Sequence, residues 1–264
     1  MKFAIIGAGN MGGALARGLA MGTKVAACDI VVSNPSQEKL NAIKSEFPEI
    51  NITNDNCEAV AGADIVVLAV KPWKVQEVVE EIKDRLDYAS QVVASMVGGL
   101  SFAQLSLWLS KGDSLPATYI IIPNTAIAVM NSMTFIASEH STAERDSEIL
   151  SIFSELGAAM LVDEALIPAG TSLASCGIAY AMRYLAAAME GGTNLGFSGC
   201  DAKKIVEQTM RGALTLLAAN GTLPEQEIKR VTTPGGLTLK GLEAMESAGF
   251  SNSVKEGLNA SIKR

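Results

Sequence analysis

A glycine-rich turn near the amino terminus constrains this chain more than any other feature. Residues 7–12 read Gly-Ala-Gly-Asn-Met-Gly, directly after the apolar run Phe3–Ile6 and before a helical pattern. In such a turn Gly7 permits the tight bend, Gly9 lets the backbone approach a pyrophosphate, and Gly12 lets the helix pack closely on the strand. The free N–H groups at the helix start would bind the anion. The sequence therefore predicts a strand, a phosphate-binding turn and a helix.

Hydrophobic periodicity divides the chain near residue 163. Up to that point, short β-branched runs alternate with amphipathic patterns such as Val75–Leu86, which is typical of βαβ units in a parallel sheet. The expected strands are Phe3–Ile6, Ile30–Val32, Ile65–Val70, Gln91–Val97, Tyr119–Ile122 and Thr134–Ala137. After Asp163 only helical patterns follow. The fold class is therefore α/β, and we expect a Rossmann-like, doubly wound domain over residues 1–163 followed by an all-helical domain over residues 164–264.

The composition argues against several classes of function. The chain has 264 residues and a single histidine, His140, which disfavours a serine-hydrolase triad and a histidine-ligated metal centre. Its formal net charge of −7 disfavours nucleic acid and anionic membranes as partners. The four cysteines form no CxxC pair, no secretion signal precedes the first strand, and no apolar run approaches the ~20 residues that span a bilayer. We expect a cytoplasmic protein without a metal.

The end of the second expected strand distinguishes NAD from NADP. An NAD site needs a carboxylate there, and Asp29 lies at about the right distance from the glycines. However, residues 34–37 (Asn-Pro-Ser-Gln) have the pattern of a helix start, with Asn34 as N-cap and Gln37 completing a capping box. The strand would then be Ile30–Ser33, which places Asp29 at its far end, away from the cofactor.

Small polar side chains are left at the crevice end of that strand. Ser33, Asn34 and Ser36 would hydrogen-bond a 2′-phosphate without repelling it. Lys39, one helical turn further on, would add positive charge. Helix capping explains these residues as well, and it does not prevent contact with a cofactor. We expect NADPH as the preferred cofactor, with NADH as a weaker one.

Three further loops follow expected strand ends, where doubly wound sheets bind their ligands. They are residues 70–72, 96–99 and 122–125. Lys71, in the first loop, is a candidate proton donor or a solvated lysine. Asn124, in the third loop, would bond the nicotinamide or the substrate, or would simply form a turn. The residues alone leave these alternatives open.

A second candidate anion site lies in the helical half. Residues 232–238 read Thr-Thr-Pro-Gly-Gly-Leu-Thr and precede a helical run. Gly235 and Gly236 would expose backbone N–H groups at a helix start, and threonine hydroxyls flank them. This pattern predicts a nest for a carboxylate, although an ordinary loop with an N-cap has the same residues.

Taken together, the motifs resemble those of pyrroline-5-carboxylate reductases, in order and almost from end to end. They are residues 7–12, residues 69–72 (Ala-Val-Lys-Pro), residues 123–125 (Pro-Asn-Thr), residues 233–238 (Thr-Pro-Gly-Gly-Leu-Thr) and residues 249–250 (Gly-Phe). The Pro-Gly-Gly-x-Thr loop in a helical second domain is the most specific of them. The resemblance implies hydride transfer from NAD(P)H to the imine carbon of 1-pyrroline-5-carboxylate, which gives L-proline in the last step of proline biosynthesis.

The resemblance also implies a set of site residues. The loop 233–238 would hold the substrate carboxylate, and Thr238 would be catalytic through a bond to the ring nitrogen. The substrate-binding residues would be Thr233, Gly235, Gly236, Leu237, Thr238 and Asn124. The cofactor-binding residues would be Gly7, Gly9, Asn10, Met11, Gly12, Ser33, Asn34, Ser36, Ala69, Val70, Lys71, Pro72 and Asn124.

Self-association is expected on two grounds. One helical face of the second half carries an apolar stripe. Its members are Ala181, Leu185, Ala188 and Met189. The resemblance likewise implies a helical dimerisation domain that interlocks with a partner subunit, so that the active site lies between the crevice of one subunit and the helical domain of the other.

Departures from the family pattern keep two alternatives open. Where the family has serine-glycine-serine-glycine-proline-alanine-tyrosine, residues 174–180 read Ala-Ser-Cys-Gly-Ile-Ala-Tyr, and Ala126 replaces a proline. These changes are compatible with a slower enzyme, a shifted substrate or a non-catalytic dinucleotide-binding protein. A dehydrogenase of the β-hydroxyacid type would need a lysine early in the helical domain. Arg183 is the only basic residue between Gly170 and Gly199, which disfavours that alternative.

Overall fold

The computed structural model describes residues 1–262, and the chain divides between Cys176 and Gly177 into two compact units. The strands, all in the first unit, are β1 (Phe3–Ile6), β2 (Ile30–Ser33), β3 (Asn51–Thr53), β4 (Ile65–Leu68), β5 (Val92–Ser95), β6 (Ala117–Ile122), β7 (Ser132–Glu139) and β8 (Gly157–Leu161). Its helices are α1 (Asn10–Met21), α2 (Gln37–Glu46), α3 (Asn56–Val60), α4 (Val75–Ile82), α5 (Phe102–Leu109), α6 (Ala143–Glu155) and α7 (Ile167–Gly170).

The strands form one eight-stranded sheet in the order β3-β2-β1-β4-β5-β6-β7-β8. The strands from β3 to β6 are parallel, β7 is antiparallel to β6, and β8 is parallel to β7. Ile6 is in register with Ser33 on one side and with Leu68 on the other, so three carboxyl ends meet at one edge. The expected α/β, doubly wound fold is confirmed. The hydrophobic pattern did not predict β3 or β8.

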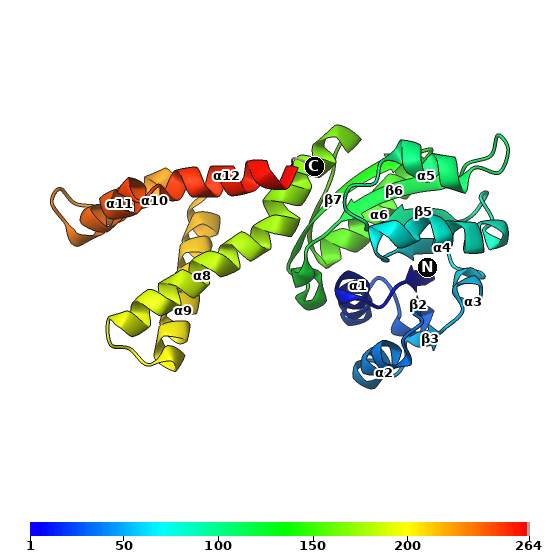
Figure 1. The fold of residues 1–264 in the computed structure, drawn as a ribbon, viewed down its shortest axis with the longest axis horizontal. Helices are drawn as coiled ribbons and strands as arrows, with labels where there is room; N and C mark the ends of the chain where they lie inside the picture. Colours follow the sequence, from blue (N-terminus) through cyan, green and yellow to red (C-terminus); the bar gives the residue numbers. More distant parts are fainter. Residues whose placement is uncertain (263–264) are drawn as a thin grey trace. The chain divides into compact units, whose positions relative to one another are not determined.

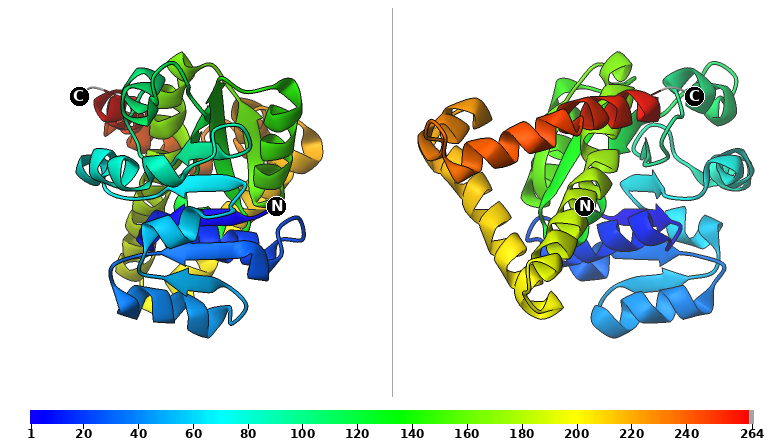
Figure 2. Two further views of the ribbon diagram at one scale, coloured as in Figure 1. Left: turned by 90° about the vertical axis from the view of Figure 1, so that its right-hand side faces the viewer. Right: turned by 60° about the vertical axis from the view of Figure 1, so that its left-hand side comes forward.

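The core of this unit consists of two apolar layers, one on each face of the sheet. Along β1, Phe3 and Ile5 belong to one layer while Ala4 and Ile6 belong to the other, as alternation along a strand requires. Figures 1 and 2 show helices on both faces of these strands. Because both faces are covered, strands such as β4 are apolar throughout instead of alternating, as in other parallel sheets.

The second unit is helical. It contains α8 (Gly177–Asn194), α9 (Gly199–Asn220), α10 (Pro224–Val231), α11 (Leu237–Ser247) and α12 (Phe250–Ile262). Helices α8 and α9 pack side by side as a hairpin. The hydroxyl of Tyr180 on α8 donates to the Gly257 carbonyl of α12 at 3.1 Å, and the rings of Tyr184 and Phe250 lie edge to face at 6.3 Å. These contacts hold α12 against α8.

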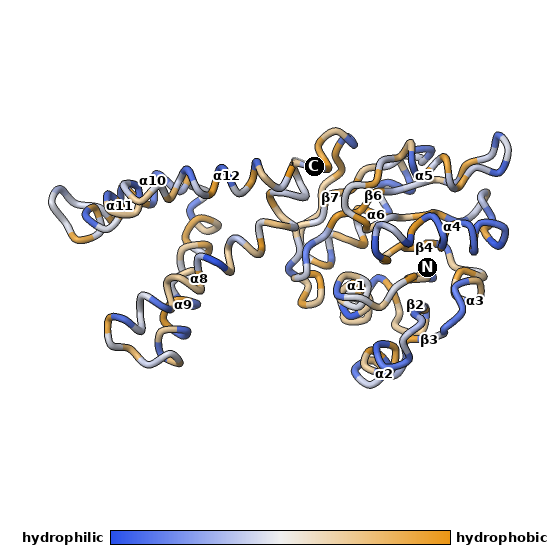
Figure 3. Tube along the Cα trace, viewed as in Figure 1, coloured by the Kyte–Doolittle hydropathy of each residue, from blue (hydrophilic) through white to orange (hydrophobic). Residues whose placement is uncertain are grey.

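The second unit has almost no interior of its own. Among its described residues, 177–262, only Ala202 is buried. Large apolar side chains remain exposed on every helix of the unit, and Figure 3 shows hydrophobic stretches recurring along them. They include Met182, Tyr184, Ile205, Leu214, Leu216, Ile228, Val231, Leu237, Met245, Phe250, Val254 and Ile262.

The helical stretch Glu164–Asn194 is long and apolar enough to cross a membrane by length and composition alone. The expectation that no apolar run reaches that length is therefore wrong. The reason is that α7, a π-helical turn (Thr171–Cys176) and α8 follow one another without a break and carry only two charged side chains, Arg183 and Glu190. The compact units divide after Cys176 and not at the expected residue 163, because residues 164–176 pack with the sheet. Ile167, for example, is buried.

Candidate functional site

The glycine turn between β1 and α1 is shaped by close backbone contacts. Gly7 has φ +112°, and a Cβ on it would lie 2.6 Å from the carbonyl oxygen of Ala69. A Cβ on Gly12 would lie 1.9 Å from the carbonyl oxygen of Gly7. Both positions therefore require glycine, one for backbone conformation and one for helix–strand packing.

Gly9 differs because the space beside it is open. It is the N-cap residue of α1, and a Cβ built on it would meet nothing within 4 Å. The first-turn N–H groups of Asn10, Met11 and Gly12 have no i−4 carbonyl to bond, and no acidic residue lies in this turn. A bare backbone, free donors and the positive end of a helix fit a pyrophosphate.

The end of β2 differs from the expected helix start. Helix α2 begins at Gln37 with Ser36 as its N-cap, so the predicted capping box from Asn34 to Gln37 is wrong. Asn34 instead accepts a hydrogen bond from the Ala8 N–H at 3.0 Å, and Gln37 bonds Asn41. The Asn34 side chain thus satisfies a donor of the glycine turn, and the helix begins two residues later than predicted.

Strand β2 itself has the expected bounds, Ile30–Ser33, and Asp29 lies in a short 3₁₀ turn directly before it. The placement of Asp29 at the amino end of the strand is confirmed. At the other end, Ser33 is buried and its hydroxyl donates to Asn56 Oδ1 at 2.7 Å. Ser36 caps α2 without a side-chain hydrogen bond, which leaves its hydroxyl and the start of a ten-residue helix available to an anion.

An ion pair joins the two helices that begin at this crevice. Arg17 of α1 donates two hydrogen bonds to Glu46 of α2, from Nε at 2.6 Å and from a terminal nitrogen at 2.8 Å. The hydrogen bond from Arg17 lowers the pKa of Glu46 from its usual 4.5 and raises that of Arg17. The pair links α1, which follows the glycine turn, to α2, which begins after the end of β2.

The loop after β4 lies against the glycine turn, as the contact between Gly7 and Ala69 shows. Within it Lys71 and Pro72 are exposed and Val70 is half-buried. Pro72 opens a 3₁₀ turn, Pro72–Lys74, whose N-cap is Lys71. The sheet register therefore brings residues 69–72 and 7–12 together at one edge, as the motifs require.

Asn124 is buried after β6 and is already bonded within the first unit. Its Oδ1 accepts from the Ala126 N–H at 3.0 Å, and its Nδ2 donates to the Ala174 carbonyl at 3.5 Å. Ala174 belongs to the π-helical turn Thr171–Cys176, which contains the first three residues of the altered run 174–180. One N–H of the amide stays available for a ligand, since an asparagine carries two.

The threonine–glycine loop of the second unit has the geometry of an anion nest. Gly235 has φ +71°, and Gly236 is the N-cap of α11. The Gly236 N–H donates to the Thr233 carbonyl at 2.9 Å, and a Cβ on Gly236 would lie 2.5 Å from Thr233 Oγ1. The first-turn N–H groups of α11, which begin at Leu237, are left without i−4 partners.

The three threonines of this loop are not equivalent. Thr232 Oγ1 donates to the Ile228 carbonyl at 3.0 Å, which ties it to α10. Thr233 and Thr238 are exposed, and within residues 1–262 neither hydroxyl has a hydrogen bond. Their hydroxyls are therefore free to bond a ligand, whereas that of Thr232 serves the helix end.

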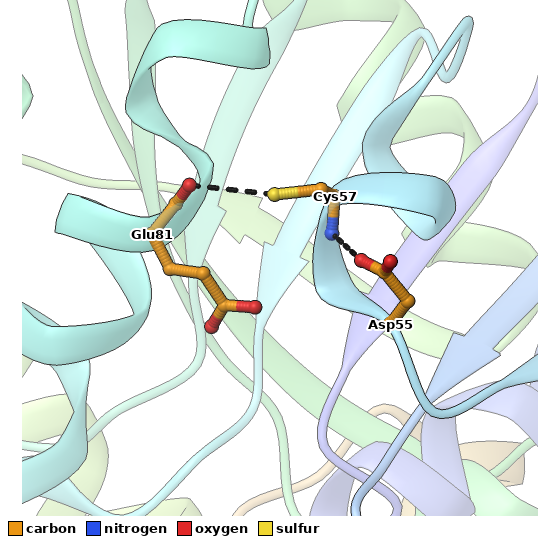
Figure 4. Close-up of side chains that lie close together, drawn as sticks. All are labelled: Asp55, Cys57 and Glu81. Atoms are coloured by element: carbon orange, nitrogen blue, oxygen red, sulfur yellow. Dashed lines mark hydrogen bonds between the residues drawn. The ribbon is translucent and has the colours of Figure 1, made fainter.

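Asp55, Cys57 and Glu81 offer ligand atoms within 4.8 Å of one another (Figure 4). Each group is engaged in the protein, however. Asp55 caps α3 by accepting the Cys57 N–H at 2.8 Å, and Cys57 Sγ donates to the Glu81 carbonyl at 3.4 Å. Glu81 Oε2 accepts from Asn56 at 2.8 Å. We interpret the cluster as a connection between α3 and α4 and assign it no metal.

Asn56 is a residue that sequence reasoning missed. It bridges Ser33 at the end of β2 and Glu81 on α4. Asn56 follows β3, so its position could be predicted only if β3 were recognised. Strand β3 (Asn51–Thr53) is too short and polar to produce a hydrophobic pattern. The single histidine has no part in these contacts, since His140 lies half-exposed beyond the end of β7.

Family profiles of known proteins match both halves of this chain. The family profile "Pyrroline-5-carboxylate reductase dimerisation" matches residues 164–264, and "NADP oxidoreductase coenzyme F420-dependent" matches residues 2–98. Pyrroline-5-carboxylate reductase 2 of Dictyostelium discoideum is 34% identical over 276 residues, which cover 100% of this chain and 91% of that protein. This chain belongs to the pyrroline-5-carboxylate reductase family. The family member from Pseudomonas aeruginosa is also 34% identical, with coverage of 100% and 95%.

Length varies among the relatives. Pyrroline-5-carboxylate reductase 1 of D. discoideum is 34% identical over 97% of this chain, but the chain spans only about half of it, 47%. Among solved structures, a pyrroline-5-carboxylate reductase from Coxiella burnetii has a TM-score of 0.86 at 28% identity, covering 99% of this chain and 96% of that one. The pyrroline carboxylate reductase of Plasmodium falciparum with NADP bound has the same fold, with a TM-score of 0.89 at 24% identity and coverage of 99% and 95%.

The comparisons confirm three expectations from the sequence. The resemblance to this family is confirmed over the full chain. The two profiles confirm a Rossmann-like unit followed by a helical dimerisation region. The profile over residues 2–98 also confirms an NADP-type cofactor for the Rossmann-like unit. The dimerisation profile also supports self-association. It begins at residue 164 whereas the compact units divide at Cys176, so the domain boundary at residue 163 stays a prediction.

Proposed function

We propose that this chain reduces 1-pyrroline-5-carboxylate to L-proline with NADPH. The observation that carries the proposal is the Pro-Gly-Gly-x-Thr nest opening α11, in a chain whose other unit carries a complete dinucleotide turn. The family relationship over the full chain supports the same activity. The reaction needs an anion site for the substrate carboxylate and orientation of a ring, and it needs no imidazole.

The first unit would hold the cofactor through backbone groups. The N–H groups at the start of α1 would bind the pyrophosphate beside Gly9, and Ser36 with the start of α2 would bind the 2′-phosphate. Asn34 would orient the glycine turn through its bond to Ala8. When bound, NADPH supplies the hydride. The absence of a carboxylate at the end of β2 supports NADPH over NADH.

The second unit would hold the substrate. The free N–H groups near Gly235 and Leu237, with the Thr233 hydroxyl, would bind the carboxylate. Thr238 would bond the ring nitrogen, and Asn124 would offer its remaining N–H to substrate or nicotinamide. The imine carbon gains a hydride while the ring nitrogen gains a proton, so C=N becomes CH–NH. Lys71 as proton donor and Lys71 as a solvated loop residue both fit its exposed position.

The proposal also covers the cellular location and the partners of the protein. We place the enzyme in the cytoplasm, because all four cysteines are free thiols, which suit a reducing compartment. We also propose that it has no nucleic-acid or membrane partner. The net charge of −7 supports the first part, and coverage of the apolar helices by a second copy of the chain would account for the second.

A substrate panel tests the activity. Oxidation of NADPH is followed by its absorbance with purified protein and either pyrroline-5-carboxylate or a series of 2-keto and 3-keto acids. We expect turnover with the imine and little with the keto acids. Binding of NADPH without turnover of the imine would overturn the proposal in favour of a non-catalytic protein. Preferential turnover of a keto acid would favour a β-hydroxyacid-type dehydrogenase. A KM for NADH tenfold below that for NADPH would contradict the cofactor assignment.

A further inference from the structure

The loop after β4 carries an unusual side chain for its position. Trp73 lies in the 3₁₀ turn Pro72–Lys74 and is 75% exposed. Exposed apolar residues are common singly, but an exposed indole beside a ligand-binding edge is typical of a recognition surface. The other tryptophan, Trp108, is by contrast partly buried against the core.

The sheet register fixes where this turn stands. Strands β2, β1 and β4 are neighbours, and their last residues, Ser33, Ile6 and Leu68, are in register. The glycine turn leaves the middle strand, and the contact of Gly7 with Ala69 brings the β4 loop directly against it. A dinucleotide whose pyrophosphate binds at the middle strand and whose ribose binds at the end of β2 has its adenine at this same edge.

Local packing directs the indole away from the core. Val75, two residues further on, is fully buried in the layer under α4. At about 120° per residue in a 3₁₀ turn, Trp73 lies roughly a third of a turn away from the buried side that Val75 occupies, in agreement with its exposure. The neighbouring Lys74 is engaged by Glu77 at 2.6 Å, so its charge is already paired. The indole is left as the flat apolar surface of the loop.

We propose that the indole of Trp73 stacks on the adenine ring of NADPH and contributes to the affinity for the adenosine half. A purine has a π-face of matching size, and stacking of a base on an aromatic side chain is favourable without requiring sequence-specific hydrogen bonds. The inference rests on the proposed cofactor but not on the proposed substrate.

The test measures binding directly and uses two halves of the cofactor. The probes are NADPH, 2′,5′-ADP, which contains the adenine, and reduced nicotinamide mononucleotide, which does not. We expect Trp73→Ala to raise the Kd for NADPH and for 2′,5′-ADP by about tenfold and to leave that for the mononucleotide unchanged. Trp73→Phe should retain most of the affinity. Leu107→Ala, at an equally exposed position on α5, is the matched control and should change none of them.

The outcomes separate the two proposals. If the wild-type chain bound neither NADPH nor 2′,5′-ADP, the cofactor assignment would fail. If the wild-type chain bound both and Trp73→Ala bound them equally well, the stacking would be refuted while the proposed function stood. A change in molecular mass on Trp73→Ala with unchanged cofactor affinity would show that the indole contacts another protein chain instead.

Discussion

At the scale of single residues, the threonine hydroxyls around the glycine pair differ in their partners. That of Thr232 donates to the Ile228 carbonyl, whereas those of Thr233 and Thr238 have no hydrogen bond among residues 1–262, which makes Thr238 the sharper probe. Thr238→Ala removes an exposed hydroxyl that bonds nothing in the described chain, so the fold should not change. We expect kcat/KM for pyrroline-5-carboxylate to fall about tenfold, as for loss of one hydrogen bond to a reacting group, with the Kd for NADPH within about twofold. Thr238→Ser should restore most of the activity. Collapse of cofactor binding would show that Thr238 is misplaced in this account.

The glycines of the turn allow a second comparison between single residues. Gly9→Ala adds a Cβ into open space with an ordinary φ of −74°, so we expect an unchanged melting temperature and a higher Kd for NADPH. Gly12→Ala adds a Cβ 1.9 Å from the Gly7 carbonyl oxygen, so the protein itself should lose stability. Thermal melts and calorimetric titration of both variants check this. Equal effects of the two substitutions on stability would contradict the separate roles.

At the scale of elements, regular hydrophobic patterns predicted most of the sheet. Runs such as Phe3–Ile6 became strands because both sheet faces bury their side chains. The failures have local causes. Strand β8 (Gly-Ala-Ala-Met-Leu) is rich in helix formers and is held in the sheet by pairing with β7. The start of α2 was misplaced because a tertiary bond from Ala8 claims the side chain that would otherwise cap the helix.

The candidate site could also be predicted in part from the elements. Strand ends and glycine motifs located the crevice loops, since carboxyl ends of parallel strands share one edge. The pattern could not reveal that Ser33 is buried against Asn56, or that the Asn124 amide is already bonded on both sides. Such bonds join residues far apart in the chain, and no local pattern specifies them.

The stabilisation by the Arg17–Glu46 ion pair between α1 and α2 should depend on pH. Arg17 lowers the pKa of Glu46 in the folded state, so the pair stabilises fully at neutral pH and loses its effect as the pH falls below the usual carboxyl value of 4.5. We expect Glu46→Gln to lower the free energy of unfolding by under about 1 kcal/mol at pH 7, because the pair is exposed. That difference should shrink progressively as the pH falls below 4.5. Glu38→Gln, on the same helix, is the control. A difference independent of pH would contradict the ion-pair account.

At the scale of the whole molecule, the second unit explains why the chain self-associates. Its helices carry large apolar side chains but bury only Ala202 among residues 177–262. A helical unit with so small an interior gains little hydrophobic stabilisation of its own. The dimerisation profile over residues 164–264 supports a second copy of the chain as the cover. The membrane-like apolar stretch falls in the same region.

Charge substitutions test whether a second copy of the chain buries these apolar side chains. Leu214 on α9 is 64% exposed, so Leu214→Glu would cost little in an isolated subunit. In an assembled protein it would bury a charge, which is strongly unfavourable. We expect a lower molecular mass in sedimentation equilibrium than for the wild type. Leu107→Glu, on α5 of the first unit, should leave the mass unchanged. An unchanged mass for Leu214→Glu would place the interface elsewhere.

In the proposed reaction the hydride of NADPH ends on the ring carbon of a cyclic imine. The most direct measurement follows NADPH consumed and L-proline formed in one reaction with pyrroline-5-carboxylate. We expect one L-proline for each NADPH oxidised, with both rates reduced in parallel by Thr238→Ala. NADPH oxidation without L-proline, or binding of both ligands with neither change, would contradict it.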